Sequence, residues 1–374
     1  NYVTRILNQP KVTLIYDDDT YNLSMIQAFE NMFRGLGQEI YQKSEINSDI
    51  NNIDITDREI EIIVNQLSES DPGMIVLAMQ ADQAEKFLVE MKRNGLQYPI
   101  IGSEVIADSQ FWERFKKYPE EQANPGFFLD GIYAETPLLL EVSGQKGQQF
   151  REEFFEKYNQ APSRLEASSY DAAKVALEAI QRTDISTRSL QQKRQRVRDT
   201  LDKINKIEEG IEGVGGQIYF DNRGNAARPL AIGVFENQNF IPAPVQLQPV
   251  TDLNRVIDLE QDVEAGRILL VNSKYMHKTQ VVYTGLDINE ISDLDLTEAS
   301  YIVDFYLWFR YQGEFDDDNI EFINSANSLK LEEPIAQGIR DGINYKAYRI
   351  KAEFKGDFYF QDYPFDHKFL LIKG

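Results

Sequence analysis

Apolar runs alternate with amphipathic stretches along roughly the first 235 residues of the chain. Near-continuous apolar runs are typical of strands in a parallel sheet that is covered on both faces. The stretches between the runs place apolar residues at helical spacing, as at Leu23, Ile26, Phe29 and Phe33. Strand–helix–strand order at this spacing predicts βαβ units and a doubly wound α/β sheet. The predicted strands are Lys11–Tyr16, Met74–Met79, Pro99–Gly102 and Phe127–Tyr133.

Further helices and a hairpin complete this first module. Helical spacing continues over Gly147–Tyr158 and Leu165–Gln181, and a strongly charged helix follows at about Thr187–Lys206. Its Arg and Lys residues suggest a basic patch, but in a chain this acidic a solvated helix face is the more common meaning. The strand Gly215–Asp221 is predicted to turn and to return through Leu230–Phe235 as a hairpin.

About the last hundred residues keep a period of two instead. Alternate residues are apolar along Tyr301–Phe309 and again along Tyr348–Phe354. Such alternation is typical of an antiparallel sheet with one buried face, and therefore of a β-sandwich or barrel. Between the two patterns, Ile241–Val250 holds three prolines in ten residues. We therefore expect a ligand-binding module at residues 1–250, an acidic linker at residues 251–266 and a β-sandwich module at residues 267–374.

Composition narrows the classes of partner. The chain has 374 residues, enough for two or three domains, and 39 basic against 61 acidic residues give a net charge of −22. This balance argues against nucleic acid and against anionic lipid as partners, but not against small cationic or zwitterionic ligands. No run of about 18 apolar residues is present, so no membrane span is predicted in this stretch. The chain opens without a signal peptide, and an exported protein would carry one upstream.

Few residues of this chain are suited to metal or nucleophilic chemistry. Cysteine is absent and there are two histidines, His277 and His367, so thiolate chemistry and a three-histidine metal site are excluded. Asp17–Asp19 follows a strand, as in aspartate-based phosphatases, but Tyr21 stands where their motif requires Thr or Val. Turn-forming aspartates are the simpler interpretation there and at Asp316–Asp318. We therefore expect neither an enzyme nor a cofactor.

A binding cleft is the stronger expectation. Ligands of doubly wound sheets lie beyond the carboxyl ends of the strands. A carboxylate with tyrosines can hold an ammonium group through charge-assisted hydrogen bonds and cation–π contacts. The same tyrosines could instead be partly buried wall residues, and the pattern alone leaves both interpretations open. The candidate ligand-binding residues are Tyr21, Met79, Gln80, Glu104 and Tyr133 near strand ends, with Tyr170 on a helix.

The first module resembles the type I periplasmic solute-binding proteins of the branched-chain amino acid type. Five segments carry this resemblance in order: KVTLIYDDDTYN, MIVLAMQ, YPIIGSEVIA, SSYDAAKVALEAI and GGQIYFDNRGN. It implies that Glu104 holds the ammonium of an amino acid, that Tyr21 touches the ligand and that Tyr170 faces the cleft. It also implies an α/β clamshell whose first half-lobe, the receiver of the ligand carboxylate, is missing from this stretch.

The second module resembles the extracellular domain of prokaryotic pentameric ligand-gated ion channels. Tyr363, Pro364, Phe365 and Asp366 match the core of the channels' signature loop, which couples binding to gating. The segment DDDNIEFINSA resembles another channel motif but lacks its Trp and Pro. The stretch ends before the later strands and the membrane helices of such channels.

Together the resemblances imply a periplasmic or cell-surface sensor that is tethered to the membrane. The clamshell would bind a small polar, amino-acid-like ligand, and the sandwich would relay its closure to a membrane part. The alternative is a plain substrate-binding protein of an ABC transporter with an accessory β-domain. A homo-oligomer is a further candidate partner. A phosphatase that uses Asp17 and Asp19 is the weakest of the hypotheses.

Overall fold

We describe the protein from a computed structural model, which describes residues 1–47, 53–184, 186, 189–227, 230–271, 274–340, 342–356 and 372. The chain divides into two compact units, Asn1–Thr279 and Gln280–Gly374. Each unit has its own sheets and its own hydrophobic core. No described helix is both long and apolar enough to cross a membrane.

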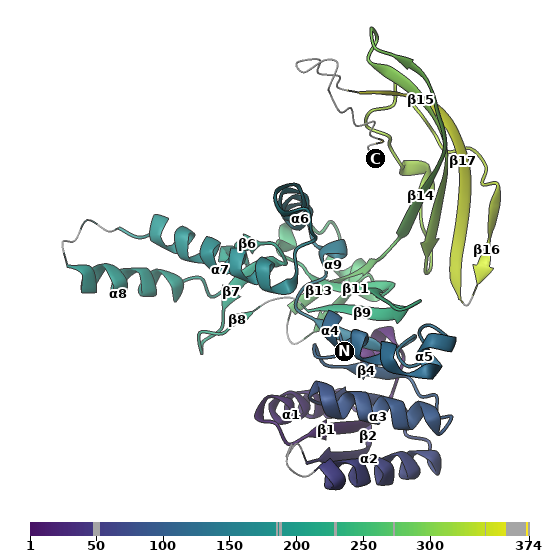
Figure 1. Ribbon diagram of the computed structural model, residues 1–374. Coiled ribbons are helices and arrows are strands. Elements are labelled where there is room, and N and C mark those ends of the chain that lie inside the picture. Colours follow the sequence, from purple (N-terminus) through teal and green to yellow (C-terminus); the bar gives the residue numbers. More distant parts are fainter. Residues whose placement is uncertain are drawn as a thin grey trace. The chain divides into compact units, whose positions relative to one another are not determined.

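A seven-stranded sheet organises the first unit. Its strand order is β10-β9-β5-β4-β3-β1-β2, in which β1 to β5 run parallel, while β9 pairs antiparallel with both β5 and β10 (Figure 1). The α/β fold expected from the sequence is therefore present, with a mixed sheet. The strands are β1 (Lys11–Asp17), β2 (Glu39–Ile46), β3 (Met74–Ala78), β4 (Ile100–Gly102), β5 (Tyr133–Thr136), β9 (Ala231–Glu236) and β10 (Asn239–Pro242).

Both faces of this sheet are buried, which explains the continuous apolar runs. In β1, Ile15 packs with the helices of one face, whereas Leu14 and Tyr16 pack on the other face with Phe33 of α1. Alternate residues of a strand point to opposite faces, so a strand between two helical layers needs apolar residues at every position. The helices are α1 (Thr20–Gly35), α2 (Ile53–Ser68), α3 (Ala81–Arg93), α4 (Ser109–Glu113) and α5 (Pro119–Ala123).

The start and end of α1 follow from local chemistry. Asp19 is the N-cap, and its side chain accepts a hydrogen bond of 2.8 Å from the backbone N–H of Tyr21. At the other end Gly37 has φ +73°, the left-handed conformation that glycine adopts without strain, and its N–H donates to the carbonyl of Arg34. The hydrogen bond from Tyr21 to the Asp19 cap fixes the position of Tyr21 at the carboxyl end of β1.

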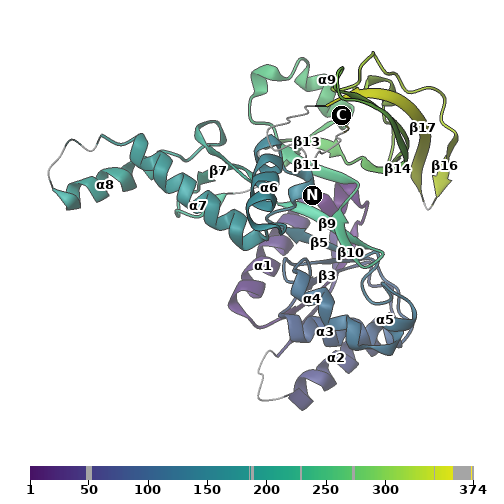
Figure 2. The same ribbon diagram turned by 45° about the horizontal axis from the view of Figure 1, so that its top comes forward.

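A helical segment is inserted between β5 and β9, two strands that are direct neighbours in the sheet. It has its own small cores, one around Phe150 and Val214 and one around Val175 and Ile218. In both ribbon views α7 and α8 extend outward from the sheet (Figures 1 and 2). We call it the inserted segment; it contains α6 (Gln145–Tyr158), α7 (Arg164–Gln181), α8 (Leu190–Leu201), β6 (Ile211–Gly213), β7 (Gly216–Phe220) and β8 (Ala226–Ala227).

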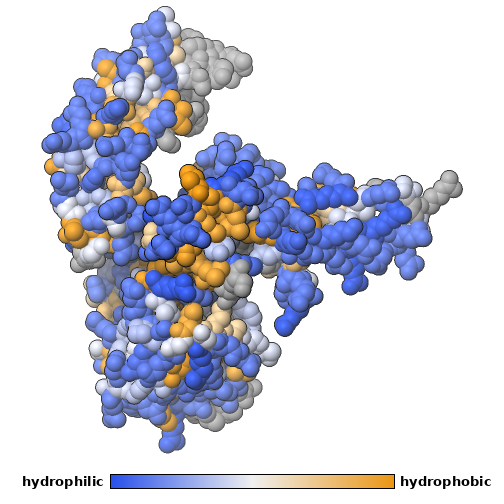
Figure 3. All heavy atoms as spheres, turned by 180° about the vertical axis from the view of Figure 1, so that it is seen from behind, coloured by the Kyte–Doolittle hydropathy of each residue, from blue (hydrophilic) through white to orange (hydrophobic). Residues whose placement is uncertain are grey.

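The charged helix of the sequence prediction is α8, which is shorter than expected and buries none of its residues. Its outer end is coloured mostly hydrophilic in Figure 3. A helix without a buried face is stabilised by its ends and by its own side-chain pairs, here Gln195 with Asp199. The structure therefore agrees with a solvated helix.

Two sequence predictions about strands were wrong, and a strand and a helix were missed. Phe127–Leu129 form turns because Glu121 accepts hydrogen bonds from the backbone N–H groups of Gly126 and Phe128, and the strand begins only at Tyr133. The segment predicted as the return strand of the hairpin is β9, which pairs with β5, whereas β7 pairs with β6 and β8. Finally, β2 and α2 were not predicted at all.

The end of the first unit is a three-stranded sheet of β11 (Val245–Pro249), β13 (Lys274–Gln280) and β12 (Ile268–Val271). The stretch expected to be a linker contains the short helix α9 (Leu259–Glu264). The second compact unit begins at Gln280, whereas the predicted β-module begins at residue 267; β12 and β13 account for this difference because they belong to a sheet with β11.

A four-stranded antiparallel sheet forms the second unit, in the order β14-β15-β17-β16. Alternation places Tyr301, Phe305 and Phe309 of β15 in the core, as the period of two predicted. The second sheet of a sandwich stays a prediction, and Tyr363, Pro364, Phe365, Asp366 and His367 lie outside the described residues. The strands are β14 (Tyr283–Asp295), β15 (Ser300–Tyr311), β16 (Ala336–Arg340) and β17 (Ile343–Lys355).

Candidate functional site

The carboxyl ends of β1, β3, β4 and β5 meet along one edge of the large sheet. These strands are parallel neighbours, so the residues that follow them are brought together although they are far apart in sequence. We call this edge, with the side chains of Tyr21, Glu104, Glu135 and Arg164 that gather there, the carboxyl-edge cluster.

Asp17 closes the base of this edge. It is fully buried and accepts three hydrogen bonds: from Asn22 Nδ2 at 2.7 Å, from the N–H of Gln80 at 2.6 Å and from the N–H of Asp19 at 3.2 Å. These donors belong to the starts of α1 and α3, so Asp17 holds both helices to β1. A carboxylate with this set of partners is committed to structure and is a poor candidate for a nucleophile.

Glu104 follows β4 by two residues and forms an ion pair with Arg164, the first residue of α7. Its Oε2 accepts a single hydrogen bond of 2.7 Å from Arg164 Nη1. The loop that carries Glu104 folds back tightly on the end of β4. A Cβ added to Gly102 would lie only 2.2 Å from Ile106 Cδ1, so the position admits glycine alone without a shift of Ile106. The pair therefore joins the sheet to the inserted segment at a position fixed by close packing.

Glu135 is the second carboxyl group of the cluster. It lies on β5, and burial, together with the negative charge of Glu104, raises its pKa to about 7. The pKa of Tyr21 is also raised, by burial and by the negative charges of Glu104 and Glu135, while the positive charge of Arg164 lowers it. The shift of Tyr21 therefore reflects the charges of Glu104, Glu135 and Arg164 nearby, and the shift of Glu135 reflects its burial and the charge of Glu104.

The other predicted ligand residues take different places. Met79 is 1% exposed in the core beneath α2 and α3, so its side chain serves packing rather than the edge. Gln80 is the N-cap of α3 and has an exposed side chain, and Tyr133 is half-buried against the core, where burial raises its pKa. Tyr170 packs on Phe150 with a ring separation of 4.9 Å within the inserted segment.

The remaining candidates are accounted for by local structure. Asp19 caps α1, and Asp316 caps a 3₁₀ turn by accepting from the N–H of Asp318. His277 lies on β13 opposite Ile268. No group of three or more His, Cys, Asp or Glu side chains suited to a metal ion occurs among the described residues.

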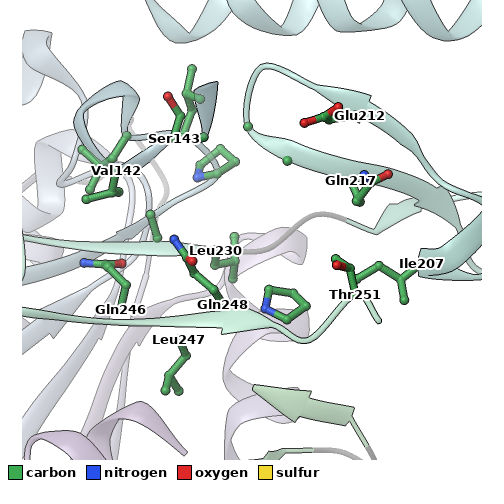
Figure 4. Close-up of a pocket in the computed structure, with 18 residues that line it drawn as sticks. Val142, Ser143, Ile207, Glu212, Gln217, Leu230, Gln246, Leu247, Gln248 and Thr251 are labelled. Atoms are coloured by element: carbon green, nitrogen blue, oxygen red, sulfur yellow. The ribbon is translucent and has the colours of Figure 1, made fainter. Parts of the chain in front are cut away.

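A separate pocket of about 320 Å³ lies between the inserted segment and β11 (Figure 4). Figure 4 shows Glu212 and Gln217 on the β6–β7 side and Gln246 and Gln248 on β11. The amide of Gln246 is already bonded to the backbone of Ile232 and Ala243, which clamps β9 to β11. Gln246 is therefore committed to the fold, whereas Gln217 Oε1 in the same lining is buried without a hydrogen-bond partner among the described residues. Sequence reasoning did not find this pocket.

Sequence reasoning also missed Arg164 and Glu135. Glu135 stands two residues after Tyr133 at a strand end, which is a readable signal once the strand is placed correctly. Arg164 had no signal of this kind, because its ion pair with Glu104 joins positions 60 residues apart.

The model of the family described as periplasmic binding protein matches residues 1–239. The leucine-binding protein of Thermotoga maritima is 19% identical with a TM-score of 0.50, over 65% of this chain and 62% of that protein. A branched-chain amino acid transporter substrate-binding protein of Streptococcus pneumoniae, solved in complex with isoleucine, is 21% identical with a TM-score of 0.48, over 64% of this chain and 61% of that protein. The chain thus spans less than two thirds of the length of either structure. A search of curated proteins found no match.

Proposed function

The chain belongs to the periplasmic binding protein family, and on that premise we propose that it binds a small amino-acid-like ligand outside the cytoplasm. The observation that carries this proposal is the carboxyl-edge cluster, where two carboxyl groups and Tyr21 gather beyond the strand ends. Acidic and aromatic side chains in such a place suit an ammonium group. The leucine-binding relative supports the choice of ligand class.

Glu104 is the residue we expect to hold the ammonium group. Its side chain is one-third exposed, and its Oε1 has no hydrogen-bond partner among the described residues. In contrast, Asp17 at the same edge is buried and accepts three hydrogen bonds. An acceptor that is accessible and only partly used can take a ligand without loss of an internal bond.

Isothermal titration calorimetry against the twenty amino acids tests this function. We expect at least one to bind, and Glu104→Gln to weaken that binding by about 10- to 100-fold, because a charge-assisted hydrogen bond is replaced by a neutral one. Glu156→Gln, at an exposed position of α6, is the matched control and should bind like the parent. Absence of binding by the parent protein, or full affinity in Glu104→Gln, would contradict the proposal.

We further propose that the protein is membrane-tethered and that the second unit relays ligand binding to a membrane part. The second unit supports this role because it is a separate compact body with its own core of long strands. The coupling loop Tyr363–Asp366 is its proposed contact. The alternative is a substrate-binding component of an ABC transporter, in which the second unit would not respond to ligand.

The two tryptophans separate these alternatives, because Trp112 lies in the first unit and Trp308 in the second. In the Trp112→Phe variant, Trp308 is the sole tryptophan and is 38% exposed. A change of its fluorescence on saturation with ligand would support the relay. An unchanged spectrum, in a variant that binds ligand normally, would contradict the relay and favour the transport component.

A further inference from the structure

We propose that the pocket between the inserted segment and β11 is a second binding site, which takes small apolar amines in their cationic form. The inference goes beyond the proposed function, because none of the residues of the carboxyl-edge cluster lines this pocket. We call it the root pocket, since its lining comes from the chain just after β5, from the chain that leads back into β9, from β11 and from the β6–β7 hairpin.

The root pocket has the size and the apolar walls that a small organic ligand needs. Its volume of about 320 Å³ lies at the lower end of the range for small-molecule sites, about 300 to 1,000 Å³. Leu230 is 51% exposed in this lining, so a ligand that covers it removes apolar surface from water. The aliphatic side chains of the wall are Leu138, Leu139, Val142, Ile207, Leu230 and Leu247.

The charge of the lining selects a cation. Glu212 is its acidic residue, and in the part of the chain that the structure describes no Lys, Arg or His lines the pocket. Glu212 Oε2 lies 2.9 Å from Lys146 Nζ, but both side chains are 49% exposed, so Glu212 can also accept from a ligand. A carboxylate ligand would therefore meet an acid and no cation in the lining, whereas an ammonium has charge complementarity with Glu212.

Gln217 offers a second acceptor beside this carboxylate. It stands directly opposite Glu212 in the β6–β7 pairing, and residues paired in this way project to the same face (Figure 4). Its Oε1 is buried without a hydrogen-bond partner among the described residues, and an unmade bond of a buried group is costly. The last torsion of a glutamine is broad, so this amide can turn toward the pocket and accept from an ammonium at little cost.

The opposite side of the root pocket is held in place by the fold. The amide of Gln246 is bonded at both ends, to the backbone of Ile232 and of Ala243. An ammonium on Glu212 and Gln217, with its apolar part on Leu138 or Leu247, would contact the inserted segment and this fixed side together. The ligand should therefore raise the thermal midpoint of the protein, because it binds a surface that only the folded chain forms.

Ligand-detected NMR with three probes of one branched carbon skeleton tests the inference at pH 7. The probes are 3-methylbutylammonium, 3-methylbutan-1-ol and 3-methylbutanoate. We expect the ammonium to bind most tightly, the neutral alcohol to bind about tenfold more weakly, and the carboxylate to show no binding. Absence of binding by the ammonium, or equal binding of the ammonium and either of the other probes, would overturn the inference.

Two variants of the lining locate the bound ammonium. Glu212→Gln should weaken its binding by about tenfold, because a charge-assisted hydrogen bond is replaced by a neutral one. Gly215→Leu should abolish it by filling the pocket: an ideal Cβ at Gly215 lies 3.4 Å from Leu138 Cδ1, an ordinary contact, and a longer side chain there occupies the space of the ligand. Full affinity in both variants would overturn the inference. The exposed position of Glu212 keeps Glu212→Gln informative if Gly215→Leu fails to fold.

Controls separate this site from the carboxyl-edge cluster. Glu156→Gln, at an exposed position of α6 outside the lining, should bind the ammonium like the parent. Glu104→Gln, which is expected to lose amino acid affinity, should also keep the ammonium. If Glu104→Gln loses the ammonium while Glu212→Gln keeps it, the inference is overturned and the proposed function stands. If no amino acid binds but the ammonium responds to Glu212→Gln as expected, the proposed function fails and this inference stands.

Discussion

Asp317 of the second unit and Glu135 of the first are both partly buried carboxyl groups, but their pKa values shift in opposite directions. Asp317 accepts hydrogen bonds from Lys346 Nζ at 2.7 Å and from the hydroxyl of Tyr348. Burial alone would raise its pKa, but these two donors outweigh burial and lower it. Glu135 has no hydrogen-bond partner for its side chain among the described residues, and burial with the charge of Glu104 raises its pKa to about 7.

The difference separates carboxyl groups that hold the fold from those that are available to a ligand. A carboxylate whose pKa is lowered is stabilised in its charged form by partners that the fold supplies. A carboxyl group whose pKa is raised lacks such partners, and a cation that reaches it can supply them. By this criterion Asp317 is structural, whereas Glu135 is available for binding.

The largest expected effect comes from Asp17, a paired carboxylate at the end of β1. Asp17→Ala should lower the free energy of unfolding by about 3 kcal/mol, because three donors at the starts of α1 and α3 lose a buried acceptor. Urea denaturation measures this. Asp71→Ala, which breaks an exposed pair with Lys11, should change it by less than about 0.5 kcal/mol. Equal effects of the two variants would mean that pairing is not the deciding property.

Asp317→Asn should have an intermediate effect, about 2 kcal/mol near pH 7. The native pKa of Asp317 lies below its ordinary value of 3.8, so its contribution is present above that pH and is lost as the pH falls through the native pKa. The stabilities of parent and variant should therefore converge in acid. Asp318→Asn, at the exposed neighbouring position, is the control, and a gap between parent and Asp317→Asn that persists at pH 2 would count against the comparison.

The smallest effect, with the opposite sign, is expected for Glu135→Gln. The native group binds a proton more tightly than the unfolded one, so the parent protein loses stability as the pH rises from 4.5 to about 7. The variant lacks this slope and should be more stable than the parent by about 1 kcal/mol at pH 8, with no gain at pH 4. Thermal unfolding across this range measures it. A parent that gains stability over the same interval would show that Glu135 has a partner.

The sequence predicts those strands of the fold whose pattern of apolar residues is produced by only one kind of burial. Continuous apolar runs located β1, β3 and β4 because strands between two helical layers need apolar residues on both faces. Strict alternation located β15 and β17 because one face of that sheet is buried. In contrast, β2 has a polar pattern with few buried positions, so nothing in its composition distinguished it from a loop.

The candidate site was only partly readable for a related reason. Strand ends are predictable, and this placed Tyr21 and Glu104 at one edge. Partners that arrive from distant parts of the chain are not predictable, so Arg164 was missed. Met79 was misjudged because the strand ends at Ala78, which leaves the Met79 side chain in the core rather than at the edge.

The pairing of β5 with β9 has a consequence for the order in which the chain acquires its structure. Thr136 and Ala231 are directly opposite each other, yet the whole inserted segment is synthesised between them. The edge of β5 that pairs with β9 therefore stays unpaired until the inserted segment and β9 have been synthesised. Contacts between residues so far apart in sequence are slow to form. Because the inserted segment has local cores of its own, we expect it to fold first and so to shorten the effective loop that brings β9 back to the sheet.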